Sequence, residues 1–379
     1  MAGYLITLNS EEALEQCIKT GTYSTILNEP RASKWLTNHE GTFADYLSMK
    51  AGDLVFFFIK RKIYGCGILV NVKNVDCKFL NYKEADVPRP NKKETYGKKH
   101  LLPYGSTNNR CFCVFKPCPH FFKEGIDMDE ILQNKSCPFH AVRTLWKLSF
   151  IKMDEIEAIT LFNIILKNNE ERLRDKEAHY LYSDKVLRAL EREELDNYRL
   201  TGKGIIKTCI NHKLLDHEMA LEASLCEKLS NEGIQPFGKW NYVSHQVPAS
   251  PFKPIDYMDK MDIFGYKYMD DNPLATKVIS KYLIAELKKG PAEKEVVEQI
   301  MKYVDWVSDE YANGDYSMIE AYVVASEFSE EIKEIVRKHC IRNFNKGFRP
   351  TKFCEWKNIK LVKYEVENDD LRYEVIPIA

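Results

Sequence analysis

Two side chains at the end of an apolar run are the first candidates for chemistry. Glu286 and Lys288 lie two residues apart in the run YLIAELK, which covers residues 282–288. Because side chains two apart on a β-strand point to the same face, the carboxylate and the ammonium are expected to project side by side. The remaining residues are apolar, which is typical of a strand buried on both faces. Alone, this pair predicts a salt bridge as readily as a catalytic site.

A second carboxylate would turn this pair into a metal site. Asp262 opens an expected strand over residues 261–268, and Asp256 and Asp259 are alternatives to it. Carboxylate oxygens are the ligands that Mg²⁺ and Mn²⁺ prefer, so Asp262 and Glu286 are the predicted metal ligands. Such a metal stabilises charge on phosphate oxygens and supplies hydroxide near neutral pH. Lys288 is then expected to position or help deprotonate the attacking water.

Three further polar residues lie on expected helices. Gln299 and Tyr303 are four residues apart and share one face of a helix predicted over 295–308. They are expected to orient the site or to donate hydrogen bonds to a DNA backbone. Glu222 borders the apolar stripe of an amphipathic helix predicted over 216–230. For Gln299 and Tyr303 an ordinary helix face is the alternative.

The order of these residues carries a resemblance to a known family. Met261-Asp262-Ile263, Glu286-Leu287-Lys288 and Gln299–Tyr303 follow one another as the D, ExK and QxxxY motifs of the PD-(D/E)XK nuclease superfamily. Residues 214–325 are similar in particular to the C-terminal domain of NucS-type nucleases, with Glu222 in place of the family's helix glutamate. The resemblance implies a restriction-endonuclease-like α/β domain with a central mixed sheet. It also implies Mg²⁺- or Mn²⁺-dependent hydrolysis of DNA, most simply double-stranded DNA. It does not reach the NucS N-terminal domain, so it implies no mismatch specificity.

The first 150 residues predict a β-rich domain of another kind. Residues 53–60 and 63–70 form an expected hairpin. The runs GDLVFFF (52–58) and IYGCG (63–67) look like the central hairpin of EVE domains, which belong to the PUA-like barrels. That resemblance implies a nucleic-acid reader that holds modified bases in an aromatic-lined pocket. The candidate pocket residues are Trp35, Phe43, Tyr46 and Tyr64. Plain core packing is the alternative for all four.

A stretch rich in cysteine and histidine covers residues 111–140. Its potential zinc ligands are Cys111, Cys113, Cys118, His120, Cys137 and His140. The spacing fits no standard zinc knuckle, and Cys111 and Cys113 alternate with apolar residues as in a strand. Zinc is therefore left open. The eleven cysteines of the chain are expected to be reduced thiols.

The chain is long enough for two or three domains, since it has 379 residues. We expect a β-barrel reader over 1–152, a helical connector over 153–212 and the nuclease domain over 213–379. Near the C-terminus, strands are expected over 361–366 and 371–376 as a closing hairpin. A basic surface is predicted there to hold a phosphate backbone, with a solvated face as the alternative. Its residues are Arg337, Lys338, Arg342, Lys346 and Arg349.

Bulk properties limit the partners. The net charge of −1 gives no argument for nucleic acid from overall basicity, so binding would depend on local patches and a metal. The sequence has no apolar run long enough to cross a bilayer and no signal peptide, which predicts a soluble, cytoplasmic protein. Cutting both DNA strands needs two active sites, so a homodimer or higher homo-oligomer is expected.

These features together predict a metal-dependent DNA endonuclease. The leading hypothesis is restriction of foreign DNA or antiphage defence, with the N-terminal domain sensing a feature such as a modified base. DNA repair is an alternative use of the same parts. A DNA-binding or regulatory protein on a nuclease fold that no longer cuts is the other alternative.

Overall fold

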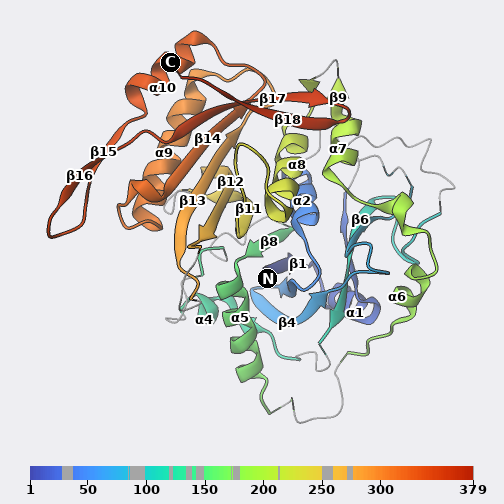
Figure 1. The fold of residues 1–379 in the computed structure, drawn as a ribbon. Helices are drawn as coiled ribbons and strands as arrows, with labels where there is room; N and C mark the ends of the chain where they lie inside the picture. The colour runs from blue at the N-terminus through green and yellow to red at the C-terminus, as the bar shows by residue number, and fades with distance from the viewer. Residues whose placement is uncertain are drawn as a thin grey trace. The chain divides into compact units, whose positions relative to one another are not determined.

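The computed structural model divides the chain into two compact units, Met1–Leu200 and Thr201–Ala379 (Figure 1). The segment expected as a connector, 153–212, is shared between these units, because the division falls after Leu200. The structure describes residues 1–27, 37–83, 85, 99–118, 123–133, 139–141, 149–171, 173, 180–211, 214–249, 259–270 and 276–378.

The first unit is built on one curled sheet with the strand order β2-β6-β4-β3-β1-β8; β5 pairs with β6 and β7 with β4. Strands β1 and β3 run parallel, whereas β3 and β4 form the expected antiparallel hairpin. The strands are β1 (Gly3–Thr7), β2 (Thr22–Ile26), β3 (Leu54–Ile59), β4 (Lys62–Leu69), β5 (Lys78–Leu80), β6 (Asn109–Pro117), β7 (Ile126–Asp127) and β8 (Phe150–Met153).

Aromatic packing shows how strongly this sheet curls. The rings of Tyr23 on β2 and Phe150 on β8, the two ends of the strand order, lie 5.4 Å apart in a T-shaped contact. Tyr46 of helix α2 (Thr37–Ser48) contacts the same Phe150 ring at 5.1 Å. The sheet is therefore half-barrel in form, with α2 packed where its end strands approach.

Helices of the first unit complete its core. Helix α5 (Glu155–Asn168) begins with a capping box between Asp154 and Glu157 and buries Ala158, Leu161 and Ile165 among the sheet residues. It is thus part of the first unit's core rather than part of a separate connector. The other helices are α1 (Glu11–Thr20), α4 (Met128–Leu132), α6 (Lys185–Leu190) and the 3-10 turn η3 (Leu195–Tyr198).

The second unit is a mixed six-stranded sheet with the order β11-β12-β13-β14-β17-β18. Strand β14 pairs parallel with β13 on one side and with β17 on the other. The pairs β11–β12, β12–β13 and β17–β18 are antiparallel. The expected closing hairpin is present as β17 and β18. The strands are β11 (Tyr242–Pro248), β12 (Lys260–Tyr268), β13 (Ile279–Leu287), β14 (Ile319–Ala325), β17 (Ile359–Glu367) and β18 (Asp370–Ile376).

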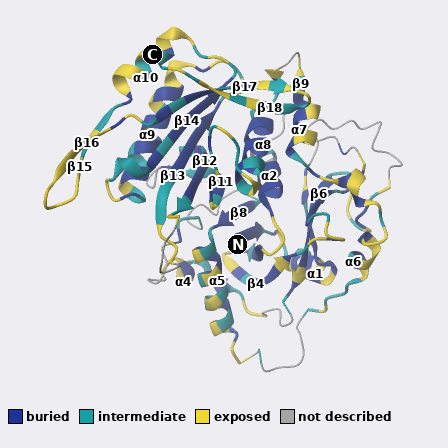
Figure 2. Ribbon diagram, in the orientation of Figure 1, coloured by how far each residue is buried: buried dark blue, intermediate teal, exposed yellow. Residues whose placement is uncertain are grey.

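Two long helices position the residues of interest against this sheet. Helix α8 (Glu218–Asn231) packs against β11, β12 and β13, and helix α9 (Lys294–Glu310) packs against β13 and β14. Valine and isoleucine side chains recur along one face of α9 and are buried in the core, whereas its other face is exposed (Figure 2). The unit also contains two further helices, α7 (Gly202–Cys209) and α10 (Glu330–His339), and the turn η5 (Tyr316–Met318). Two short strand pairs complete it: β9 (Ile210–Asn211) with β10 (Leu214–Leu215), and the ribbon of β15 (Arg342–Lys346) with β16 (Lys352–Trp356).

Within the portion of the chain that the structure describes, no helix is both long and apolar enough to cross a membrane.

Candidate active site

The pairing of β12 with β13 brings the two predicted metal ligands together. Ile263 pairs with Ala285 in this antiparallel ladder, so the next residues along, Asp262 and Glu286, lie opposite one another. Asp262 Oδ2 accepts a hydrogen bond from the backbone amide of Leu287 at 2.8 Å, so a side chain rather than a carbonyl is the acceptor here. This bond fixes the orientation of Asp262 beside Glu286.

Glu286 and Lys288 form the side-by-side pair that the alternation of strand residues predicts. Lys288 Nζ donates to Glu286 Oε1 at 2.8 Å and to the Leu287 carbonyl at 3.0 Å. Glu286 is 1% exposed, and its second oxygen, Oε2, is buried without a hydrogen-bond partner among the described residues. A buried charged oxygen without a partner is costly. This atom is therefore available to a ligand.

Glu222 reaches the same place from α8 through two residues of β11. His245 Nδ1 lies 2.6 Å from Glu222 Oε1, and the amide nitrogen of Gln246 lies 3.4 Å from Glu222 Oε2. The same Gln246 nitrogen donates to Asp262 Oδ1 at 3.1 Å. Glu222, Asp262 and Glu286 therefore form one group of carboxylates, tied together by Gln246 and the β12–β13 ladder.

His245 and Gln246 are site residues that the sequence did not predict. Consecutive side chains on a strand normally point to opposite faces, yet both of these reach Glu222. Gln246 has a φ of 50°, in the left-handed region that non-glycine residues rarely adopt, and this turns the chain locally. The sequence contained one usable signal, a polar His-Gln pair inside the otherwise strand-like run YVSHQVP.

The electrostatics of this group favour a cation. Burial, and then the charges of Glu286 and Glu222, raise the pKa of Asp262 well above its usual range. Burial also raises the pKa of Glu286, although Lys288 partly offsets the effect. Burial by itself would lower the pKa of Lys288, but the attraction of Glu286 outweighs it and the pKa is raised. Asp262 and Glu218, whose Oε1 lies 4.0 Å from Lys288 Nζ, raise that pKa further, so one ammonium faces several carboxylates.

Gln299 and Tyr303 lie behind the carboxylates. Gln299 Nε2 donates to the Tyr303 hydroxyl at 2.7 Å, and that hydroxyl donates to the Lys260 carbonyl at 2.9 Å. Lys260 begins β12, two residues before Asp262. Tyr303 is 1% exposed, and its hydroxyl is directed to the start of β12 rather than to the surface.

The site suits an ion held by few protein ligands. Among the residues that the structure describes, no three His, Cys, Asp or Glu side chains are arranged to hold one metal ion. Mg²⁺ typically binds one or two carboxylates and keeps several waters. The pair of Asp262 and Glu286, with the unpartnered Glu286 Oε2, matches that donor set.

The predicted nucleic-acid contacts have mixed outcomes. Trp35 lies outside the described residues, and Tyr64 is partly exposed on β4. Phe43 and Tyr46 are fully buried, so the expectation that they line a base-binding pocket is wrong for these two and they pack as core. Arg337 and Lys338 are exposed on α10, where Lys338 pairs with Glu334 of the same helix.

The cysteine-rich stretch has no described zinc cluster. Cys111 and Cys113 are buried within β6, as alternation along a strand predicts. The sulfur of Cys118 lies 3.2 Å from that of Cys66 on β4. His120 and Cys137 lie outside the described residues. The cysteines that are described are free thiols.

No known protein family and no curated protein matches this chain. Solved structures give partial similarities. A complex of EndoMS with dsDNA is 24% identical over 21% of this chain and 27% of its own, with a TM-score of 0.16. A repair endonuclease from Pyrococcus abyssi is 22% identical over 35% of this chain and 47% of its own, with a TM-score of 0.21. A hypothetical protein from Leishmania major is 15% identical over 46% of this chain and 98% of its own, with a TM-score of 0.27. The match thus spans about a quarter and about half of the first two proteins.

Proposed function

We propose that this protein is a Mg²⁺- or Mn²⁺-dependent DNA endonuclease whose active site is formed by Asp262, Glu286 and Lys288. The observation that carries the proposal is the convergence of two buried carboxylates and one ammonium, with Glu286 Oε2 left without a partner among the described residues. When bound by Asp262 and Glu286, the metal would supply charge stabilisation at the phosphate and a hydroxide near neutral pH.

The protein's own groups perform the remaining tasks. An ammonium group has three N–H donors. Lys288 uses two of them on Glu286 and the Leu287 carbonyl, and Glu218 Oε1 lies 4.0 Å from Nζ, beyond hydrogen-bond distance. Its third donor is available to a phosphate oxygen or to the attacking water. From this position Lys288 can position or help deprotonate the attacking water, and its charge offsets that of the phosphate.

Glu222 acts from α8 on the other side of Asp262. The hydrogen bonds from His245 and Gln246 hold its carboxylate in one orientation. From there it can accept a hydrogen bond from a water bound near Asp262. Gln299 and Tyr303 hold the start of β12 and thereby the position of Asp262.

The test is cleavage of supercoiled plasmid in Mg²⁺ or Mn²⁺. We expect the wild type to cut and Lys288→Ala to lose at least about a hundredfold in rate, as for removal of a preorganised charge. Lys360→Ala is the matched control, because Lys360 also contacts a glutamate of this sheet, Glu320, but lies on β17. Equal rates for wild type and Lys288→Ala would show that the site is wrong. A wild type that binds DNA and cuts nothing would show a regulatory protein instead.

The DNA substrate that the protein prefers distinguishes a role in defence from a role in repair. Restriction or antiphage defence predicts that modified or foreign DNA is cut in preference, with the first unit as reader. Repair predicts preference for mismatched or damaged duplexes. A homodimer or higher oligomer predicts linear rather than nicked product at the first turnover.

A further inference from the structure

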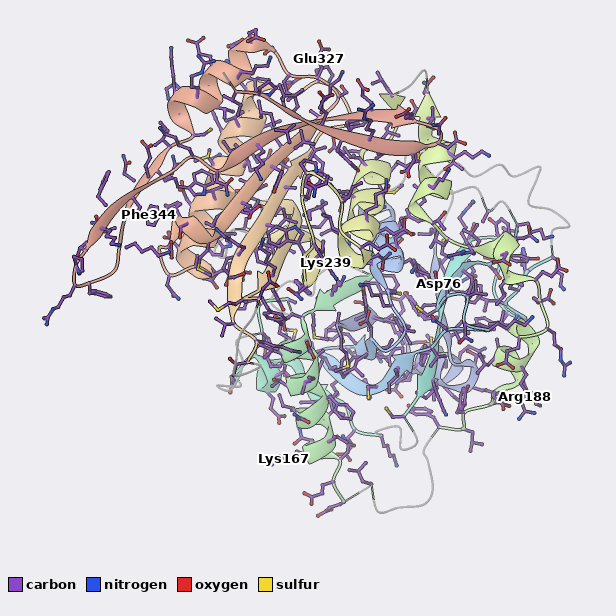
Figure 3. The ribbon with its side chains drawn as sticks, viewed as in Figure 1. Asp76, Lys167, Arg188, Lys239, Glu327 and Phe344 are labelled. Carbon is purple, nitrogen blue, oxygen red and sulfur yellow. The ribbon has the colours of Figure 1, made fainter. Side chains whose placement is uncertain are left out.

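A two-stranded ribbon extends from the second unit. Strands β15 and β16 pair antiparallel, from Arg342 opposite Trp356 to Lys346 opposite Lys352. The ribbon projects away from the six-stranded sheet, and its far end is exposed; Phe344 marks its middle (Figure 3). Strands of five residues make the arm about 16 Å long. A free ribbon of this kind buries little of its own surface.

The root of this arm is held rigidly. Arg342 makes a bidentate ion pair with Asp305 of α9, at 2.7 and 2.8 Å. The Trp356 indole donates to the Ile319 carbonyl, where β14 begins, at 2.9 Å. The arm is therefore oriented relative to the sheet that carries Glu286, rather than a loose extension.

The arm is rich in basic side chains, which suits it to bind a polyanion. Residues 342–357 contain five basic side chains and one acidic side chain, in a chain whose net charge is −1. Lys346 and Lys352 face each other across the ribbon, so two positive charges lie side by side on it. Lys346 is paired with Asp315, whereas Arg349 and Lys352 have no ion pair with any described residue.

Two aromatic side chains near the far end of the arm are exposed instead of packing in a core. Phe348, in the turn between the strands, is 97% exposed and Phe353 is 74% exposed. The turn needs Gly347, whose φ is 79°. An aromatic ring at the tip of a basic ribbon is suited to apolar contact with thymine methyl groups, which line the major groove.

We propose that this arm enters the major groove of duplex DNA, with Phe348 leading and with Arg349 and Lys352 on the phosphates. The inference rests on the proposed function, because it takes DNA as the ligand. A major groove about 12 Å wide admits a two-stranded ribbon.

The arm lies away from the cleavage site along the sheet. Ile319, to which Trp356 is bonded, pairs with Tyr282, four residues before Glu286 and hence about 13 Å from it. The root of the arm therefore lies about four base pairs' length from Glu286, at 3.4 Å per base pair. The arm strengthens binding and does not take part in the chemical step.

The test is the salt dependence of binding by the full-length protein. A labelled duplex several helical turns long is titrated in EDTA, where no hydrolysis occurs, at a series of salt concentrations. Removal of two phosphate contacts in Arg349→Ala/Lys352→Ala should lower the slope of log K against log salt by about 1.8. Phe348→Ala should weaken binding with the slope unchanged, because it removes an apolar contact and no charge. The control Lys203→Ala/Lys207→Ala removes two exposed charges from α7 and should leave the slope unchanged.

The outcomes separate the two proposals. If wild type binds DNA with a steep salt slope and Arg349→Ala/Lys352→Ala has the same slope, the arm proposal is overturned while the nuclease stands. If wild type neither binds nor cuts DNA, the proposed function fails and the arm proposal fails with it. If the arm variants instead change the mass of the free protein in light scattering and leave DNA binding intact, the arm joins copies of the chain and does not bind DNA.

Discussion

Asp262→Asn should make the metal-free protein more stable while it abolishes cleavage. The substitution keeps the side-chain size and an oxygen to accept the Leu287 amide hydrogen bond. Gln246 keeps its hydrogen bond to Glu222 and loses the one to residue 262 where the new amide nitrogen takes the place of Oδ1. The substitution removes one negative charge beside Glu286 and Glu222, so the predicted gain in the free energy of unfolding is electrostatic.

Distances in the structure give the size of this effect. Gln246 Nε2 lies 3.4 Å from Glu222 Oε2 and 3.1 Å from Asp262 Oδ1, so these two oxygens are at most 6.5 Å apart. Two unit charges at about 6.5 Å repel by about 2.6 kcal/mol at an effective dielectric constant of about 20. Glu286 adds to this repulsion and Lys288 reduces it. We expect a gain of about 2–3 kcal/mol.

The gain should depend on pH in a defined direction. Burial and the neighbouring carboxylates raise the pKa of Asp262 in the folded state. A raised folded-state pKa means that the wild type loses stability as pH rises above the unfolded value of about 3.9. The advantage of Asp262→Asn is therefore larger near neutral pH than at about pH 4.

The assay is urea unfolding in EDTA and in Mg²⁺, followed by tryptophan fluorescence. Saturating Mg²⁺ should stabilise the wild type, by about 2.7 kcal/mol at a hundredfold excess over Kd, and should not stabilise Asp262→Asn. If Asp262→Asn is less stable than wild type in EDTA and still gains stability from Mg²⁺, the carboxylates are not a charge cluster that binds a cation.

Three other substitutions test separate parts of the account. Gln246→Leu removes the amide hydrogen bonds to both site carboxylates, so the Mg²⁺ concentration for half-maximal cleavage should rise about 10–100-fold; an unchanged Mg²⁺ titration would argue against this bridging role. Tyr303→Phe removes the hydroxyl that links α9 to β12 and should cost about 1–3 kcal/mol in urea unfolding; a neutral effect would mean that the link is not stabilising. Burial, and then the charge of Asp154, raise the pKa of Glu157 from 4.5 to about 7, so the first unit should lose roughly 3 kcal/mol as pH rises from 4.5 through 7. Glu157→Gln should flatten this profile in denaturant midpoints, and an equally sloped profile would contradict the assignment.

Local patterns in the sequence predicted much of the second unit. The apolar run before Glu286 became a buried strand, and the spacing of Gln299 and Tyr303 placed them in hydrogen-bond contact on one helix. The closing hairpin was also predicted, because its strands are consecutive in the chain. These features depend on neighbours in the sequence and on the periods of helix and strand.

Features that depend on distant contacts were not predicted. His245 and Gln246 join the site through a left-handed backbone conformation and through pairing with α8 and β12, which no local pattern indicates. The sequence around helix α5 predicted a connector, yet the helix packs in the core of the first unit. The β15–β16 ribbon lacks the regular apolar alternation of a half-buried strand, so its sequence was not recognised as a strand pair.

The most direct test of the central claim is single-turnover cleavage of duplex DNA in Mg²⁺ by Glu286→Gln beside Glu320→Gln. Both substitutions neutralise a glutamate of this sheet that pairs with lysine, but only Glu286 has an unpartnered buried oxygen among the described residues and lies opposite Asp262. The account predicts that Glu286→Gln loses at least about a hundredfold in rate while Glu320→Gln cuts as the wild type does. Equal rates for the two variants would contradict it.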